Sequence, residues 1–147
     1  MQQAKSCGVI VLRNTPKLSF LLMEKPNRYD LPKGHVEGDE DELSCALREL
    51  QEETGILASD LEVDVRFRFV ETYHTRYKRF GKQLVEKSVV IFLGWLKHDV
   101  EIQLTEHSGY KWVDWQPPHL IQIKTIDPLL KQLDEYLKSS NGFGNGC

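Results

Sequence analysis

The chain has 147 residues, of which 40% are apolar and 28% are charged. This composition excludes wholesale disorder and a fibrous repeat, and the length suits one domain, since domains cluster near ~100–150 residues. The net charge of -3 excludes a globally basic protein that coats nucleic acid. A polyanionic partner would therefore have to meet a local basic cluster or a bound metal ion.

The sequence shows neither a membrane span nor a processed leader. Apolar runs stay well below the ~18 residues of a membrane helix, and the first residues lack the cleavage pattern of a signal peptide. The cysteines Cys7, Cys45 and Cys147 are scattered, so they predict neither a disulfide framework nor a metal clip. We expect a cytoplasmic protein with no membrane contact and no disulfide partner.

The first part of the chain predicts a hairpin followed by a loop. Two apolar runs, 8–12 and 18–23, flank a segment of turn residues, which is typical of two antiparallel strands. Residues 25–38 are rich in Pro, Gly and charge, which favours a loop.

A helix is predicted over residues 41–54. Asp39 or Asp41 can cap its start, and Gly55 can end it. Apolar residues recur there at steps of three and four and form one stripe, as in an amphipathic helix: Leu43, Ala46, Leu47 and Leu50.

Three strands and one helix are predicted in the second half. Residues 63–69 alternate apolar and polar side chains, which indicates a strand with one wet face. Residues 88–96 are apolar on both faces, as in a central strand, and 110–113 form a further short strand. Asp127 followed by Pro128 marks the start of the last helix.

Together these elements predict an α+β fold, with a mixed sheet covered on two faces. Residues 1–138 form one domain, and residues 139–147, rich in Gly, Asn and Ser, form a flexible tail.

Three carboxylates fall on the first predicted helix. Glu49, Glu52 and Glu53 lie within one turn, because side chains three and four residues apart share a helix face. Carboxylates at close range raise one another's pKa, and a hard divalent cation relieves their repulsion. Oxygen ligands without His or Cys suit Mg²⁺ or Mn²⁺ rather than zinc. A run of Glu on a helix is also typical of a plain solvated face.

Residues 34–56 carry a motif with nine specified positions. Gly34 is followed after five residues by Glu40, and seven more residues lead to the segment Arg48–Ile56, which reads R-E-L-Q-E-E-T-G-I. This segment resembles the signature of the Nudix hydrolases, G-x5-E-x7-R-E-U-x-E-E-x-G-U, in which U is aliphatic. The resemblance extends over about residues 5–138 and implies an α/β/α sandwich around a mixed sheet.

The resemblance implies a role for each matched position. It implies that Glu40 and Arg48 hold the loop and helix in place, with Arg48 counted among the catalytic residues. The implied cofactor is Mg²⁺, with Mn²⁺ as a substitute, and the implied reaction is attack of water on phosphorus in a nucleoside diphosphate derivative. The implied metal ligands are Glu49, Glu52, Glu53 and the Gly34 carbonyl.

Other residues narrow the substrate. The run 31–37, LPKGHVE, is similar to one in the diadenosine tetraphosphate hydrolase branch, where the Lys and His lie beside the phosphate chain, which implies this role for Lys33 and His35. Tyr73, 17 residues after the motif, is typical of dinucleoside polyphosphate hydrolases. Glu106 resembles a carboxylate that reaches the metal site, which makes it a ligand or the general base.

A basic segment, residues 74–87, interleaves aromatic side chains with Lys and Arg. Basic groups meet phosphates, and aromatic faces stack on bases. Tyr77, Phe80 and Lys87 are therefore candidate substrate contacts. The expected reaction is asymmetric hydrolysis of Ap4A to ATP and AMP, with Glu53 or Glu106 as general base.

Other functions fit the same motif. They are removal of pyrophosphate from capped or triphosphorylated RNA 5′ ends, hydrolysis of diphosphoinositol polyphosphates, and cleavage of nucleoside triphosphates. A non-catalytic nucleotide sensor is a further reading, although such a module usually loses motif glutamates and this chain keeps them all. The loop residues outside the motif also fit plain solvated surface.

Overall fold

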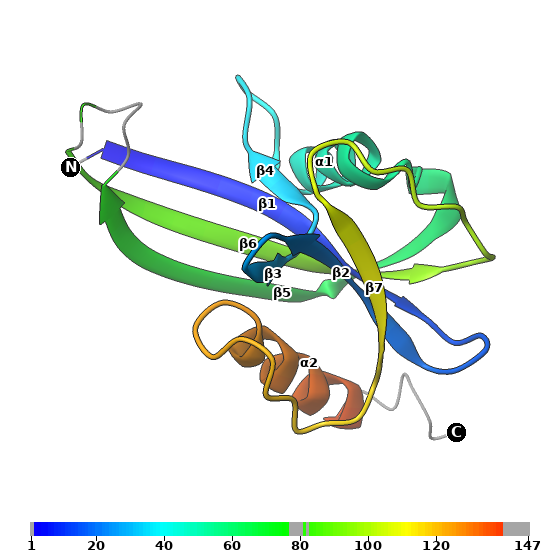
Figure 1. The fold of residues 1–147 in the computed structure, drawn as a ribbon. Helices are drawn as coiled ribbons and strands as arrows, with labels where there is room; N and C mark the ends of the chain where they lie inside the picture. Colours follow the sequence, from blue (N-terminus) through cyan, green and yellow to red (C-terminus); the bar gives the residue numbers. More distant parts are fainter. Residues whose placement is uncertain (1, 77–80, 82, 140–147) are drawn as a thin grey trace.

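The computed structural model describes residues 2–76, 81 and 83–139. A mixed seven-stranded sheet lies between two helices, one on each face (Figure 1). This arrangement confirms the expected α+β sandwich. No helix in these ranges is long and apolar enough to cross a membrane. The elements in chain order are β1 (Gln2–Arg13), β2 (Ser19–Lys25), β3 (Arg28–Asp30), β4 (Lys33–His35), α1 (Glu42–Thr54), η1 (Ala58–Asp60), β5 (Leu61–Arg76), β6 (Leu84–Leu96), β7 (Gly109–Asp114) and α2 (Asp127–Ser139).

The sheet is built around β1 and β6, which run parallel to each other. The strand order is β3-β2-β1-β6-β5, with β4 paired to β1 and β7 paired to β2. The predicted hairpin exists, but β1 and β2 pair only at the turn, from Leu12↔Phe20 to Arg13↔Ser19. Beyond that point β2 pairs with β7, and the free edge of β1 receives β4. Beyond the turn, β1 and β2 therefore no longer pair with each other. The candidate site lies on the β4 side of the sheet.

Two apolar clusters cover the two faces of the sheet. One joins α1 to the sheet and includes Val9, Ala46 and Leu50. The other joins α2 to the opposite face and includes Phe67 and Leu133. Because alternate residues of a strand point to opposite faces, β1 and β6 supply side chains to both clusters. This explains why the 88–96 segment is apolar throughout.

The predicted ends of α1 are confirmed. Asp41 is the N-cap, and its side chain accepts a hydrogen bond from the Ser44 N–H at 2.8 Å. Gly55 ends the helix in the left-handed conformation with a φ of 80°. The second helix begins at Asp127 as expected, and the Asp127 carboxylate accepts hydrogen bonds from the Ile121 and Gln122 N–H groups of the preceding loop.

Three segments differ from the sequence prediction. Residues 25–38 contain the short strands β3 and β4, because edges of β1 and β2 offer unpaired backbone groups there. Val65 is 57% exposed rather than buried, because a register shift between Asp64 and Arg68 interrupts the alternation. Ser139 is the last residue of α2, and the remainder of the predicted tail lies outside the described residues.

An ion-pair triad ties α1 to β1 and β5. The Glu42 carboxylate lies 2.8 Å from Lys5 Nζ and 2.9 Å from Arg68 Nε. Hydrogen bonds from Arg68 and Lys5 lower the pKa of Glu42 from 4.5 to about 2. A carboxyl whose pKa is lowered on folding contributes its stability above its unfolded pKa, and that contribution is lost as the pH falls from 4.5 towards 2.

We therefore expect Glu42→Gln to lower the free energy of unfolding at pH 7 by about 1 kcal/mol. The effect is small because Lys5 and Arg68 are half-exposed, so solvent screens the ion pairs. The difference should shrink between pH 4.5 and 2. Urea denaturation across this range measures it. Glu62→Gln, an exposed carboxylate on β5, is the control. A pH-independent difference would contradict the assignment.

Candidate active site

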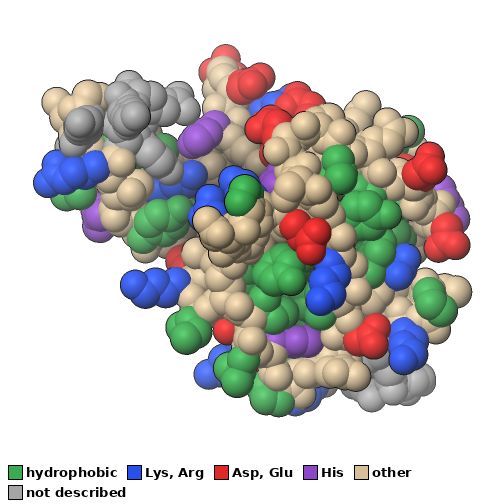
Figure 2. Space-filling view, in the orientation of Figure 1, with side chains coloured by type: hydrophobic (Ala, Val, Ile, Leu, Met, Phe, Trp, Pro, Cys, Tyr) green, Lys and Arg blue, Asp and Glu red, His purple; other side chains and the backbone are tan. Residues whose placement is uncertain are grey.

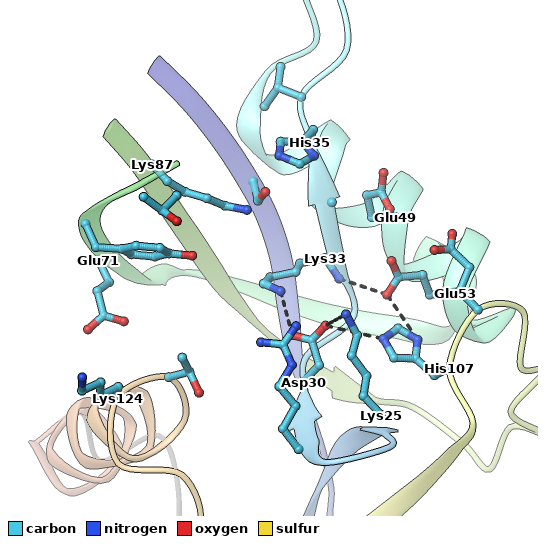
Figure 3. Close-up of a pocket in the computed structure, with 18 of the residues that line it drawn as sticks. Lys25, Asp30, Lys33, His35, Glu49, Glu53, Glu71, Lys87, His107 and Lys124 are labelled. Atoms are coloured by element: carbon cyan, nitrogen blue, oxygen red, sulfur yellow. Dashed lines mark hydrogen bonds and ion pairs between the residues drawn. The ribbon is translucent and has the colours of Figure 1, made fainter. Parts of the chain in front are cut away.

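One cleft of about 1310 Å³ opens between α1, the sheet and the loop before α2. Its lining comes from β1 to β6, from both helices, and from the loops before β7 and α2 (Figure 3). On the face shown in Figure 2, acidic side chains gather at the tip of the loop between β4 and α1. The cleft thus draws residues from segments far apart in the sequence. Its basic lining residues are Lys25, Arg28, Lys33, Lys87 and Lys124.

The floor of the cleft is one face of the sheet. The pairing of β5 with β6 sets Tyr73 opposite Lys87, which is 8% exposed. The pairing of β1 with β4 sets Ser6 opposite His35, and Lys33 shares that face because it lies two residues before His35. Cross-strand neighbours lie within ~5.5 Å of each other, so the basic groups of β4 and β6 face the same side of the sheet.

Arg48 holds the loop before α1 against the helix. Its Nε donates to Glu40 Oε2 at 2.7 Å, and its Nη2 donates to Glu40 Oε1 at 3.0 Å and to the His35 carbonyl at 3.0 Å. This bidentate pair lowers the pKa of Glu40 to about 2. The Nη1 group donates to Glu49 at 2.9 Å and to Glu52 at 3.1 Å. Arg48 therefore orients the loop and two motif carboxylates at once.

Glu49 and Glu53 face the cleft from α1, one turn apart (Figure 3). The Glu53 side chain is 9% exposed, and its Oε1 accepts a hydrogen bond from the Lys33 N–H at 3.3 Å. Burial and the negative charge of Glu49 raise the pKa of Glu53 to about 8. Burial also raises the pKa of Glu49. Glu52 is different, since its side chain is 57% exposed and does not line the cleft.

The donor atoms at this end of the cleft fit a hard cation. In the part of the chain that the structure describes, no group of three or more His, Cys, Asp and Glu side chains stands ready to hold a metal ion. Glu49 and Glu53 nevertheless supply oxygen atoms whose mutual repulsion a divalent cation would relieve. A Cβ added at Gly34 would lie 2.1 Å from Glu49 Cδ, so only glycine lets the β4 backbone approach this carboxylate.

Asp30 and His107 belong to the site, although sequence reasoning assigned them no role. Asp30 accepts a hydrogen bond from Lys33 Nζ at 2.7 Å and lies 3.5 Å from His107 Nε2. Burial alone would raise the pKa of Asp30, but Lys33 and Lys25 together lower it. The His107 side chain is 4% exposed, and its Nδ1 lies 3.9 Å from Glu53 Oε1. His107 directly follows Glu106, which was the available signal, whereas Asp30 sits in no motif.

A family model described as "NUDIX domain" matches residues 3–136. The chain belongs to the Nudix family. Members of this family generally use divalent metal ions, in agreement with the oxygen donors of the cleft.

Several known proteins match this chain over most of their own length. The asymmetrical bis(5′-nucleosyl)-tetraphosphatase of Rattus norvegicus is 36% identical over 92% of this chain and 97% of its own. The solved binary complex of a C. elegans Ap4A hydrolase matches with a TM-score of 0.77 and 30% identity, covering 92% of this chain and 98% of its own. An RNA pyrophosphohydrolase of Hydrogenovibrio crunogenus is 28% identical over 76% of this chain and 73% of its own.

The structure brings most residues predicted from the Nudix motif and its surroundings to one place. Glu52 and Arg48 stand beside the cleft rather than in its lining, and Tyr77 and Phe80 lie outside the described residues. Glu106 is exposed at the rim. The predicted residues that line the cleft are Lys33, Gly34, His35, Glu49, Glu53, Tyr73, Lys87 and Glu106.

Proposed function

We propose that this protein is a Mg²⁺-dependent hydrolase of dinucleoside polyphosphates in the cytoplasm, and that it converts Ap4A and water into ATP and AMP. The observation that carries the proposal is a single cleft with carboxylates at one end and five Lys and Arg side chains along it. Carboxylates suit a metal that screens phosphate charge, and the basic side chains suit a long phosphate chain. The similarity to asymmetrical tetraphosphatases supports the same substrate.

The proposed metal ligands are Glu49, Glu52, Glu53 and the Gly34 carbonyl, with Glu106 as a further candidate. Mg²⁺, when bound, supplies positive charge that polarises the phosphorus and lowers the pKa of water. Mn²⁺ offers a similar charge and coordination and should substitute.

The chain's own residues orient the substrate and move the proton. Lys33, His35 and Lys87 hold phosphate oxygens, and Tyr73 contacts a base. Water attacks an end phosphorus of the tetraphosphate, Glu53 accepts its proton, and the bridging P–O bond to the other three phosphates breaks. ATP leaves with the bridging oxygen, and AMP keeps the oxygen from water. Glu53 is favoured over Glu106 as the base because its side chain is buried in the cleft, whereas Glu106 is exposed at the rim.

A substrate panel tests the proposal. We expect Ap4A to give equimolar ATP and AMP with Mg²⁺ or Mn²⁺ and no turnover after chelation, measured by chromatography of the products. Ap4A should also raise the melting temperature more with metal than without it, because linkage makes each ligand strengthen the other. Absence of ATP plus AMP would overturn the choice of substrate.

Removal of pyrophosphate from RNA 5′ ends is the second candidate. It is favoured by the similarity to RNA pyrophosphohydrolases and by the basic lining of the cleft. A 5′-triphosphorylated oligonucleotide belongs in the same panel. A kcat/KM for this RNA above that for Ap4A would reverse the order of the two proposals.

A further inference from the structure

Glu71 is a carboxylate inside the cleft that has no role in the metal site. It comes from β5, is partly buried, and points towards Lys124 (Figure 3). Within residues 2–76, 81 and 83–139, the Glu71 carboxylate has no hydrogen-bond or ion-pair partner. The carboxylates at the metal end of the cleft, where α1 and β4 meet, do have partners. Asp30 is paired with Lys33, and Glu49 is paired with Arg48.

The sheet register places Glu71 at the opposite edge of the floor from the metal end. Glu71 pairs with Val89, Val89 pairs with Ser6, and Ser6 pairs with His35. One row of cross-strand partners thus runs from the phosphate-binding strand β4 to the outer strand β5. Neighbouring strands are ~4.8 Å apart, so Glu71 stands roughly 14 Å from His35, three strand spacings away.

The surroundings of Glu71 differ in chemistry from those of β4. Tyr73 lies two residues further along β5 and faces the same side, with 40% of its surface exposed. Lys124 and Thr125, from the loop before α2, also line the cleft, with Lys124 on the side towards which Glu71 points (Figure 3). An aromatic ring, hydroxyl groups and a carboxylate match the ring and hydroxyls of a nucleoside better than they match a phosphate.

A carboxylate here opposes the binding of phosphate. Glu71 repels a phosphate at its own position on β5, although the cleft also carries five basic side chains. Partial burial without a partner is also unfavourable, and burial raises the pKa of Glu71. A ligand that donates hydrogen bonds to this carboxylate would remove that cost.

We propose that Glu71 accepts hydrogen bonds from the vicinal ribose hydroxyls of the substrate's nucleoside and disfavours a phosphate group at its own position on β5. The inference rests on the proposed function and deepens it. The two carboxylate oxygens can accept from two adjacent hydroxyls, an arrangement that other folds use to hold ribose. Glu71 would then place the nucleoside end of the substrate at β5. It would also disfavour ligands that consist only of phosphate groups.

Two variants isolate this role. Glu71→Leu removes both acceptor oxygens, and Glu86→Leu makes the same change one strand away, where the side chain pairs with His74 on the other face of the sheet. Equilibrium binding of AMP and of 2′-deoxy-AMP to each protein is measured by calorimetry. Wild type and Glu86→Leu should favour AMP by about tenfold, since a hydrogen bond to a charged group is worth at least that factor. Glu71→Leu should lose this preference.

A second readout uses inorganic tripolyphosphate as a competitor of Ap4A hydrolysis. Because the substitution removes a negative charge, tripolyphosphate should inhibit Glu71→Leu more strongly than wild type. Equal binding of AMP and 2′-deoxy-AMP by wild type, or an unchanged preference in Glu71→Leu, would overturn the inference. The binding assay needs no turnover, so failure of Ap4A hydrolysis would refute the proposed function without deciding the role of Glu71.

Discussion

Glu53→Gln should lower kcat for Ap4A by about 10³-fold or more while the protein stays folded. General-base catalysis alone contributes about 10²–10⁴-fold, and an amide cannot accept the proton of the attacking water. The amide keeps the size of the side chain and can still accept the hydrogen bond from the Lys33 N–H. Initial rates at saturating substrate with Mg²⁺ measure the effect.

The stability of this variant separates a catalytic effect from misfolding. Glu53 is buried, and burial and Glu49 disfavour its charged form, so its neutral replacement should melt no lower than wild type without metal. Glu101→Gln changes an exposed carboxylate outside the cleft and should leave kcat unchanged. If the kcat of Glu53→Gln is within tenfold of wild type, Glu53 is not the general base, and Glu106 becomes the candidate for that role.

The features that the sequence predicts correctly depend on residues that are close together in the chain. The period of Leu43, Ala46 and Leu50 and the residues Asp41 and Gly55 determine where α1 begins and ends. The motif spacing then places Glu49 and Glu53 one turn apart, and the structure shows both facing one cleft. Local pattern was sufficient here because helix geometry converts spacing directly into a shared face.

The features that sequence reasoning missed depend on strands that are distant in the chain. β4 has three residues and forms only because the edge of β1 is free beside it. Asp30 enters the site because β3 pairs with β2, and Glu71 enters because β5 pairs with β6 at the far edge of the sheet. No spacing within the chain encodes these neighbours, since sheet register is decided by pairing between segments.

Gly34→Ala tests whether the approach of β4 to α1 serves the chemistry rather than the fold. The added Cβ would lie 2.1–2.3 Å from the carboxylate atoms of Glu49, so the Glu49 side chain must move away. That carboxylate is the far end of a flexible chain, and it can rotate at little cost in stability. We therefore expect kcat to fall by about 10²-fold, because displacing a group by ~1 Å can cost that much, with only a small change in melting temperature. Metal affinity, measured by calorimetry with Mn²⁺, should fall as well.

Gly38→Ala supplies the opposite pattern. Nothing lies within 4 Å of a Cβ at Gly38, but its φ of 56° is left-handed, so alanine there is strained. That strain costs about 1–2 kcal/mol of stability. Gly38→Ala should therefore lower the melting temperature while kcat and Mn²⁺ affinity stay near wild type, whereas Gly34→Ala should do the reverse.

If Gly34→Ala loses stability and activity together, the glycine is needed for the packing of β4 on α1. If it keeps full activity, Glu49 does not act from the position it occupies against Gly34, and the carboxylate end of the cleft would need another set of ligands.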